Sequence, residues 1–310
     1  MAVTTTTQLA ADLQTYFSKV LLRQAKYTTI LDQFGYVENI PSNSSKTISF
    51  TQYSDLTPVS SVLSEGTPPT DTQLATTAIT ATIDQLGAFV TLTDLAKLTP
   101  KHPVMQKTLE LLGVQGARTY DNYIFAAISA GSSVYYAGGV ASRALITTTS
   151  YVTFADVFKA VANMRQNGAM EFDDGNFVLA IDPKVELDLL QDTTFQNVVY
   201  RQQPNNPGKN ELYKGRITTF GGVTIVRSNQ LGNDTVLGGV GGAIPIHFSF
   251  VIGQNGYAVT NLQNMQTYTQ GPGSVYDPLE QKMTVGWKFG FKSVILNNNF
   301  FTRIESASRY

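Results

Sequence analysis

The side chains that most often carry catalysis are scarce in this sequence. The chain has no cysteine and only two histidines, His102 and His247, which lie far apart. Thiolate chemistry and cysteine metal sites are therefore excluded, and the H-E-x-x-H and G-x-S-x-G motifs of zinc proteases and serine hydrolases are absent. A Ser–His–Asp triad assembles in space, so the sequence leaves it open. We predict no catalytic residue and no enzymatic activity.

The glycine-rich and acidic stretches lack the spacing of known ligand loops. The glycines between residues 238 and 242 do not fit G-x-G-x-x-G. Gly208-Lys209 is followed by Asn210 instead of the Ser or Thr of a phosphate-binding loop. The segment Asp173-Asp174-Gly175 lacks the spaced ligands of a calcium loop and is typical of a turn. We therefore predict no cofactor and no metal site.

The charge balance limits what nucleic-acid recognition could be. The chain carries 22 Lys and Arg against 23 Asp and Glu, for a net charge of -1, which excludes a strongly basic nucleic-acid binder. Trp287, Phe289 and Phe291 form an aromatic stripe at period two. Lys288 and Lys292 fall on the opposite face of that strand, so the stripe predicts core packing instead of base stacking. Any nucleic-acid contact should be weak and independent of sequence.

The surface is expected to be polar but largely uncharged. Charged residues make up 15% of the 310 residues, compared with about 25% in a typical soluble chain. Such a surface suits burial against neighbouring subunits. The length predicts about two domains. The first residues lack the pattern of a signal peptide, and no stretch approaches the ~18 apolar residues of a membrane span, so we expect neither secretion nor membrane insertion.

The first 35 residues contain one amphipathic segment. Leu13, Phe17 and Leu21 share a helical spacing, and Tyr16 lies beside them. Gly35 can end the segment. The pattern fits a helix on its own domain and an arm lying on a neighbouring subunit equally well.

A long β-hairpin is predicted between residues 40 and 98. Alternation from Lys46 to Tyr53, which includes Phe50, indicates the first strand, and the Thr-rich run 74–95 indicates the second. Between them, residues 60–72 form a polar tip that contains Glu65, Pro68 and Pro69. A two-stranded ribbon is marginal in water by itself. The hairpin must therefore fold onto its own core or, as we favour, pack on another subunit.

One long helix and a block of shorter elements follow. Residues 104–130 have helical spacing, and Gly113 and Gly116 within it indicate a bend or close packing. Thr153 and Asp156 resemble a capping box for a helix that ends at Gly168. A short apolar strand is predicted next, and Asp182-Pro183 then begins a second helix. Residues 131–150 are predicted to be a connecting loop, residues 244–252 a strand, and residues 277–306 a set of C-terminal strands.

Three stretches in this order resemble the major capsid proteins of tailed bacteriophages. They are SVLSEGTPPTDTQLATTAITATIDQLGAFVTLTDLAKLT, VTFADVFKAVANMRQNG…FVLAIDPKVELDLL and DPLEQKMTVGWKFGFKSVILNNNFFTRIES. The resemblance is to the Hong Kong 97-type fold in its short, podovirus-like form. It covers nearly the whole chain, and no single motif in it is diagnostic.

The resemblance implies an α+β capsid fold with four parts. Residues 1–40 would be an N-terminal arm and residues 41–98 an extended β-hairpin loop. Residues 99–149 and 271–310 would form a peripheral domain with a long spine helix, and residues 150–270 would form an axial domain. The axial domain would gather around the five-fold and six-fold axes, and the hairpin would lie over a neighbouring subunit.

The function implied is structural. The chain would assemble with itself as pentamers and hexamers into an icosahedral shell that encloses double-stranded DNA through weak, non-specific contact. The resemblance also implies a portal, allows a decoration protein, and involves no membrane. The protein would be assembled in the host cytoplasm and reside in the virion. We predict inter-subunit contacts at Leu13, Tyr16, Phe17, Leu21, Phe50, Tyr53, Glu65, Pro68 and Pro69.

Two features of some relatives are not expected here. Certain members join subunits by an isopeptide bond between Lys and Asn, but Lys46 lies near the base of the hairpin, away from its tip. We therefore expect no such cross-link to Asn297 or its neighbours. Other members carry a scaffolding domain before the arm. Because about 35 residues precede the hairpin here, we expect scaffolding to come from a separate protein.

Three other interpretations stay open. An encapsulin-type bacterial compartment shares the fold and would hold protein cargo in place of DNA. A secreted β-rich adhesin or binding module belongs to a different class, and the missing signal peptide and cysteines disfavour it. A soluble hydrolase is disfavoured by the two distant histidines.

Overall fold

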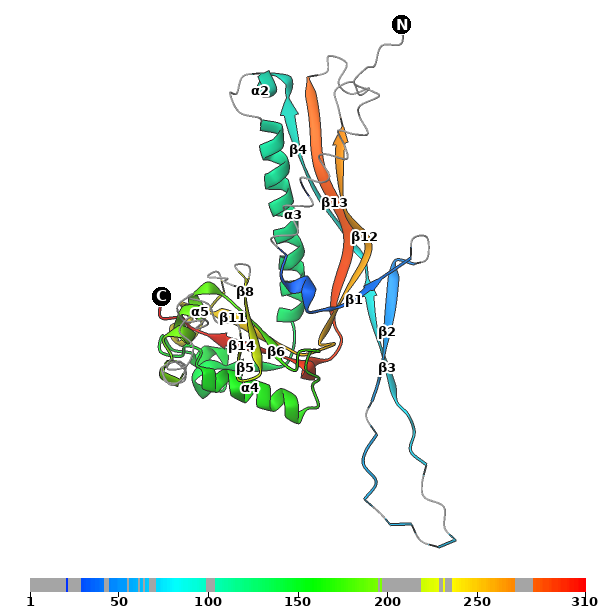
Figure 1. Cartoon of the computed structure of the whole chain (residues 1–310), viewed down its shortest axis with the longest axis vertical. Coiled ribbons are helices and arrows are strands. Elements are labelled where there is room, and N and C mark those ends of the chain that lie inside the picture. Colours follow the sequence, from blue (N-terminus) through cyan, green and yellow to red (C-terminus); the bar gives the residue numbers. More distant parts are fainter. Residues whose placement is uncertain are drawn as a thin grey trace, which may run out of the picture.

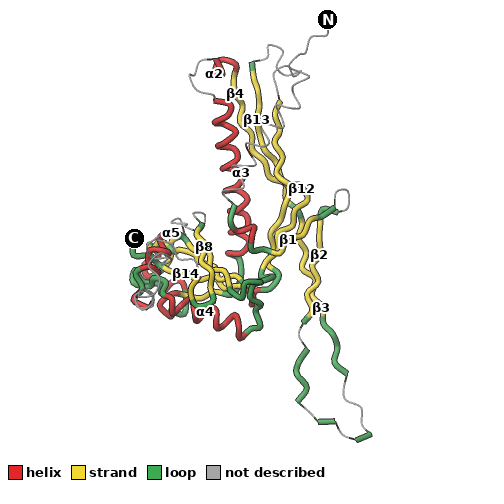
Figure 2. The backbone as a smooth tube through the Cα atoms, in the orientation of Figure 1, coloured by secondary structure: helices red, strands yellow, loops and turns green. Residues whose placement is uncertain are grey.

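The computed structural model describes most of the chain as an α+β protein built around two sheets (Figures 1 and 2). The residues described are 21, 29–41, 45–54, 56–60, 62–63, 65–66, 71–98, 104–194, 196, 219–228, 231, 236–270 and 281–310. A four-stranded sheet, called the long sheet below, runs beside a long helix. A six-stranded sheet lies near one end of that helix, and a separate hairpin extends away from both.

The long sheet has the strand order β1-β12-β13-β4. These strands are β1 (Tyr36–Asn39), β12 (Tyr257–Gln270), β13 (Lys282–Ile295) and β4 (Asp84–Thr93). β13 pairs antiparallel with both β12 and β4, and β1 adds to β12 in parallel. Helix α3 (Val104–Ser129) lies along one face of this sheet (Figure 1).

The aromatic stripe of β13 is confirmed as core. Trp287, Phe289 and Phe291 are buried against α3, and the Tyr120 ring of that helix stacks on Phe291 at a centroid distance of 4.3 Å. Gly116 marks close packing, because a Cβ there would lie 2.7 Å from Cε of Met265. The predicted helix over residues 104–130 is therefore confirmed, together with the reason for this glycine in it.

The six-stranded sheet has the order β5-β14-β11-β6-β8-β7. Its strands are β5 (Val134–Tyr136), β14 (Phe301–Ser306), β11 (His247–Ile252), β6 (Phe177–Ile181), β8 (Val223–Arg227) and β7 (Thr219–Phe220). Helices α4 (Phe154–Gln166) and α5 (Pro183–Leu190) pack on one face in a second core. The main core contains Phe125 and Ile128 of α3 with Phe248 and Phe250 of β11, so it joins this sheet to the long sheet.

The local signals for α4 and α5 are confirmed. Thr153 and Asp156 form a reciprocal capping box at the start of α4. Asp182 caps α5 by accepting from the backbone N–H of Lys184, and Pro183 occupies the first helical position. The start of each helix is determined by residues adjacent in sequence, so the sequence alone predicts where each helix begins.

The predicted second strand of the hairpin is divided in two. β2 (Thr47–Tyr53) pairs antiparallel with β3 (Thr76–Thr82) in a separate two-stranded sheet. After the buried Ile83, the chain continues as β4 and pairs with β13. The expectation of one strand over 74–95 is thus corrected, because the two halves satisfy their backbone groups in different sheets.

β12 belongs to the long sheet, because it pairs with β13 from Tyr257 onward. The segment 131–150 is not all loop, because β5 pairs in parallel with β14. The predicted strand 244–252 is broken at Ile246. The shorter elements are η1 (Leu31–Gln33), α2 (Asp94–Leu98), η2 (Ala137–Gly139), η3 (Arg143–Leu145), β9 (Leu237–Gly238), η6 (Val240–Gly242), β10 (Ile244–Pro245) and η7 (Asn298–Phe300).

Candidate assembly surfaces

The hairpin extends from the body without a second layer to cover it (Figure 2). Most side chains of β2 and β3 are exposed, and Phe50 and Ile79 are half-buried. The ring of Phe50 meets Tyr36 of β1 edge to face at 6.3 Å, which ties the hairpin base to the long sheet. Because an uncovered two-stranded ribbon is marginal by itself, the hairpin is a surface that a partner would stabilise.

The loop beyond the hairpin strands exposes apolar side chains. Val62 is 94% exposed, and its neighbour Leu63 is also largely exposed. Leu56, Val59 and Leu74 are exposed on the same loop. Soluble monomers rarely present such a concentration of apolar surface unless it makes a contact. The prediction of a polar tip over residues 60–72 overlooked Val62 and Leu63, because they are interspersed among Ser, Thr and Pro.

A groove lies between the base of the hairpin and the body. It has a volume of about 600 Å³ and is lined by Phe50 and Tyr53 of the hairpin on one side. On the other side lie Met170 and Phe300. The groove has both aromatic walls and polar groups, so it can receive an apolar side chain.

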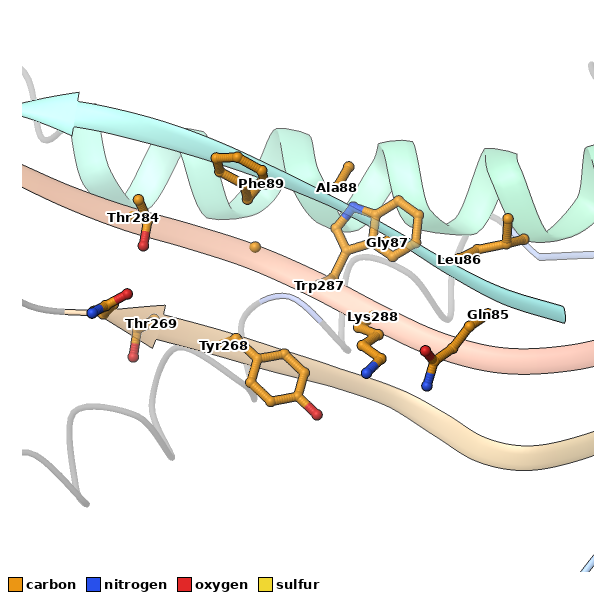
Figure 3. Close-up of a pocket in the computed structure, with 12 residues that line it drawn as sticks. Gln85, Leu86, Gly87, Ala88, Phe89, Tyr268, Thr269, Thr284, Trp287 and Lys288 are labelled. Carbon is orange, nitrogen blue, oxygen red and sulfur yellow. The ribbon is translucent and has the colours of Figure 1, made fainter. Parts of the chain in front are cut away.

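The outer face of the long sheet carries a second hollow, of about 490 Å³ (Figure 3). Phe89 of β4 and Tyr268 of β12 are both register partners of Gly286 on the central strand β13. Phe89 is 74% exposed, although it is aromatic. The absence of a side chain at Gly286 therefore leaves a depression flanked by two rings, with Lys288 at its edge.

A buried ionic cluster fixes the chain between α3 and α4 to the six-stranded sheet. Glu305 of β14 accepts two hydrogen bonds of 2.6 Å from the Arg143 guanidinium, and its carboxylate is fully buried. Nε of Arg303 lies 2.9 Å from the same carboxylate. Hydrogen bonding to Glu305 raises the pKa of Arg143. The sequence gives no signal for this cluster, since residues 143 and 305 are 162 positions apart.

The geometry around the second histidine is that of a structural pair. Nδ1 of His247 lies 3.2 Å from Oδ2 of Asp182, the residue that caps α5, and both side chains are buried. Within the described ranges, no three His, Asp or Glu side chains gather where they could hold a metal ion. None of the helices in those ranges has the length and apolar content needed to cross a membrane.

The predicted contact residues fall into three groups. Tyr53 and Glu65 are exposed, and Phe50 is half-buried, all on the hairpin and its loop. Leu21 is completely buried within the main core, which favours a role inside its own chain. Outside the described residues lie Leu13, Tyr16, Phe17, Pro68 and Pro69.

Solved structures with a similar fold include phage capsids and a virus-like particle. The capsid asymmetric unit of cyanophage Pam1 matches with a TM-score of 0.71 and 16% identity, over 88% of this chain and 89% of that chain. The capsid of cyanophage P-SCSP1u matches with a TM-score of 0.67 and 20% identity, over 91% and 89%. A virus-like particle from Pyrococcus furiosus matches with a TM-score of 0.57 and 11% identity, over 94% and 99%. These likenesses establish the Hong Kong 97-type fold.

The sequence itself matches a family model. No curated protein sequence matches the chain. The model described as phage capsid protein, however, matches residues 76–289, which run from β3 through most of β13. This span includes α3, every strand of the six-stranded sheet except β14, and three strands of the long sheet. The chain therefore belongs to the phage capsid protein family, whose members are structural proteins of the virion capsid.

Proposed function

We propose that this protein is a major capsid subunit that assembles as pentamers and hexamers into an icosahedral shell around double-stranded DNA. The observation that carries the proposal is the extended hairpin, whose loop exposes Val62 and Leu63 with no cover from the chain's own described residues. A neighbouring subunit that buries these side chains would recover the free energy that their exposure costs.

The low charge of the surface supports the same arrangement. Uncharged polar side chains can be buried between subunits without the desolvation penalty of unpaired ions. A net charge of -1 also agrees with DNA held by confinement and not by a basic patch. We further propose that a separate scaffolding protein and a portal take part, that a decoration protein can bind the shell, and that assembly occurs in the host cytoplasm.

The proposed contact of the hairpin loop can be tested by introducing charged side chains. The double variant Val62→Asp, Leu63→Asp should form shells at less than a tenth of the wild-type yield, because two carboxylates would be desolvated in the contact. The control Ser60→Asp adds a charge at a polar, exposed position of the same loop. Yield is measured by sedimentation of assembled particles. Normal assembly of the double variant would refute the proposed role of the loop.

A compartment shell of the encapsulin type is the second candidate. This candidate is supported by the similarity to a virus-like particle, which covers 99% of that particle's chain. Purified shells distinguish the two functions directly. Nuclease-protected double-stranded DNA would support the virion, and a stoichiometric enclosed protein without DNA would support the compartment.

A further inference from the structure

A buried carboxylate holds η1 against the long helix. Asp121, in the second half of α3, is completely buried. Its Oδ2 accepts the backbone N–H of Ile30 at 3.1 Å, and its Oδ1 accepts that of Leu31 at 3.4 Å. The Tyr257 hydroxyl of β12 donates to the carbonyl oxygen of Leu31. One acidic side chain on α3 thus caps, from 90 residues away, the turn that follows the N-terminal segment.

The groups that face Asp121 are acidic or phenolic. They are Asp32 from η1, Tyr120 from α3 and Tyr257 from β12. In the described part of the chain, no lysine, arginine or histidine is among the groups that shift the pKa of Asp121 or Asp32. Oδ1 of Asp32 is itself buried without a hydrogen-bond partner. Among the described residues, the two carboxyl groups therefore share a site that offers neither a cation nor enough donors for both to ionise.

Burial sets the protonation behaviour of this site. Desolvation, opposed by the Ile30 N–H and assisted by the charge of Asp32, raises the pKa of Asp121 to about 7. Burial also raises the pKa of Asp32. A protonated Asp121 retains a carbonyl oxygen for the backbone N–H groups and gains an O–H donor, which an ionised pair lacks.

We propose that Asp121 is a proton-dependent latch, which holds residues 29–33 on α3 while its carboxyl is protonated and weakens that hold when the carboxyl ionises. The direction of the pH effect follows from the linkage between proton binding and detachment. In a detached turn the carboxyl would ionise near its ordinary pKa, so a rise in pH favours detachment until the attached carboxyl also ionises. With the attached pKa near 7, the opening equilibrium should increase about tenfold between pH 6 and pH 8.

The place of the latch in the chain does not depend on whether the shell encloses DNA. The turn follows the first 28 residues, which belong to the segment 1–40 that the resemblance implies to be an N-terminal arm, and it precedes the body of the chain. A proton on α3 would then decide how firmly the start of that arm is fixed. The inference goes beyond the proposed function, because it concerns the isolated chain and needs no assembled shell.

Hydrogen exchange of the full-length subunit tests the latch. Exchange of residues 29–33 is measured at pH 6 and pH 8 and corrected for the intrinsic rate at each pH. The wild-type opening equilibrium should rise about tenfold. Asp121→Asn, which keeps the shape but cannot ionise, should abolish that rise. The control Asp173→Asn, in an exposed turn, should leave it unchanged.

A second variant keeps the test decisive if Asp121→Asn does not fold. Asp32→Asn removes the neighbouring charge that helps to raise the pKa of Asp121, so the midpoint of the pH dependence should move to lower pH. The proposal would be overturned by a wild-type opening equilibrium that is equal at pH 6 and pH 8. An undiminished rise in Asp121→Asn, or an unmoved midpoint in Asp32→Asn, would overturn it as well.

Discussion

Gly286 and Gly290 should respond oppositely to the same substitution. Both lie on β13 with one face in common. A Cβ at Gly286 would lie 2.7 Å from the carbonyl oxygen of Ala88 and 2.7 Å from Cβ of Phe89, so the paired strand would have to move. A Cβ at Gly290 would meet its nearest neighbour, Cγ2 of Ile83, at 3.5 Å, which is an ordinary contact.

The difference in the free energy of unfolding follows from these contacts. Overpacking against backbone costs about 1–3 kcal/mol, and we expect Gly286→Ala to lose about 2 kcal/mol. Gly290→Ala meets no obstruction and restricts the unfolded chain, so it should be neutral or stabilise by up to about 1 kcal/mol.

The chain carries its own reporter for this comparison. Trp287 is the single tryptophan, it is buried next to Gly286, and it stacks on Phe289 at a centroid distance of 4.9 Å. Its fluorescence during urea unfolding therefore follows the long sheet. The Gly286→Ala midpoint should fall below the wild-type value while the Gly290→Ala midpoint does not. Equal midpoints for the two variants would refute the packing argument.

Two further predictions concern stability and use the same urea titration. Glu305→Ala should lower the free energy of unfolding by about 3 kcal/mol, because it leaves the buried Arg303 without its carboxylate. Arg143→Ala should lower the free energy of unfolding by less, since the Arg143 side chain is 40% exposed. A larger loss for Arg143→Ala than for Glu305→Ala would contradict this account. Thr153→Ala removes one half of the capping box of α4 and should lower the free energy of unfolding by about 1 kcal/mol. Thr148→Ala, in an exposed loop, should have no effect, and equal losses from the two threonine variants would contradict the capping role.

Sequence alone predicts the elements whose signals are local. The capping box at Thr153, the proline start of α5 and the period-two stripe of β13 are each written in a few adjacent residues, and each is confirmed. The long helix is confirmed for the same reason, since its apolar spacing repeats over seven turns. The hairpin was also predicted, because its alternating strands flank a Pro-rich turn.

Features that depend on distant residues were not predictable in this way. The division at Ile83 arises because β4 finds a partner in β13, some 200 residues further along the chain. The hollow over Gly286 exists only because three strands meet in one register. The Arg143–Glu305 pair and the Asp121 cap join segments 162 and about 90 residues apart. None of these leaves a mark on the residues nearby in sequence.

Self-assembly is the central claim, and sedimentation velocity of the purified chain tests it most directly. The account predicts megadalton particles, or discrete pentamers and hexamers that convert to particles when a crowding agent is added. The shells should then show icosahedral symmetry in electron micrographs. A species that stays at the 33.8 kDa monomer mass at every concentration, with and without the crowding agent, would contradict the claim.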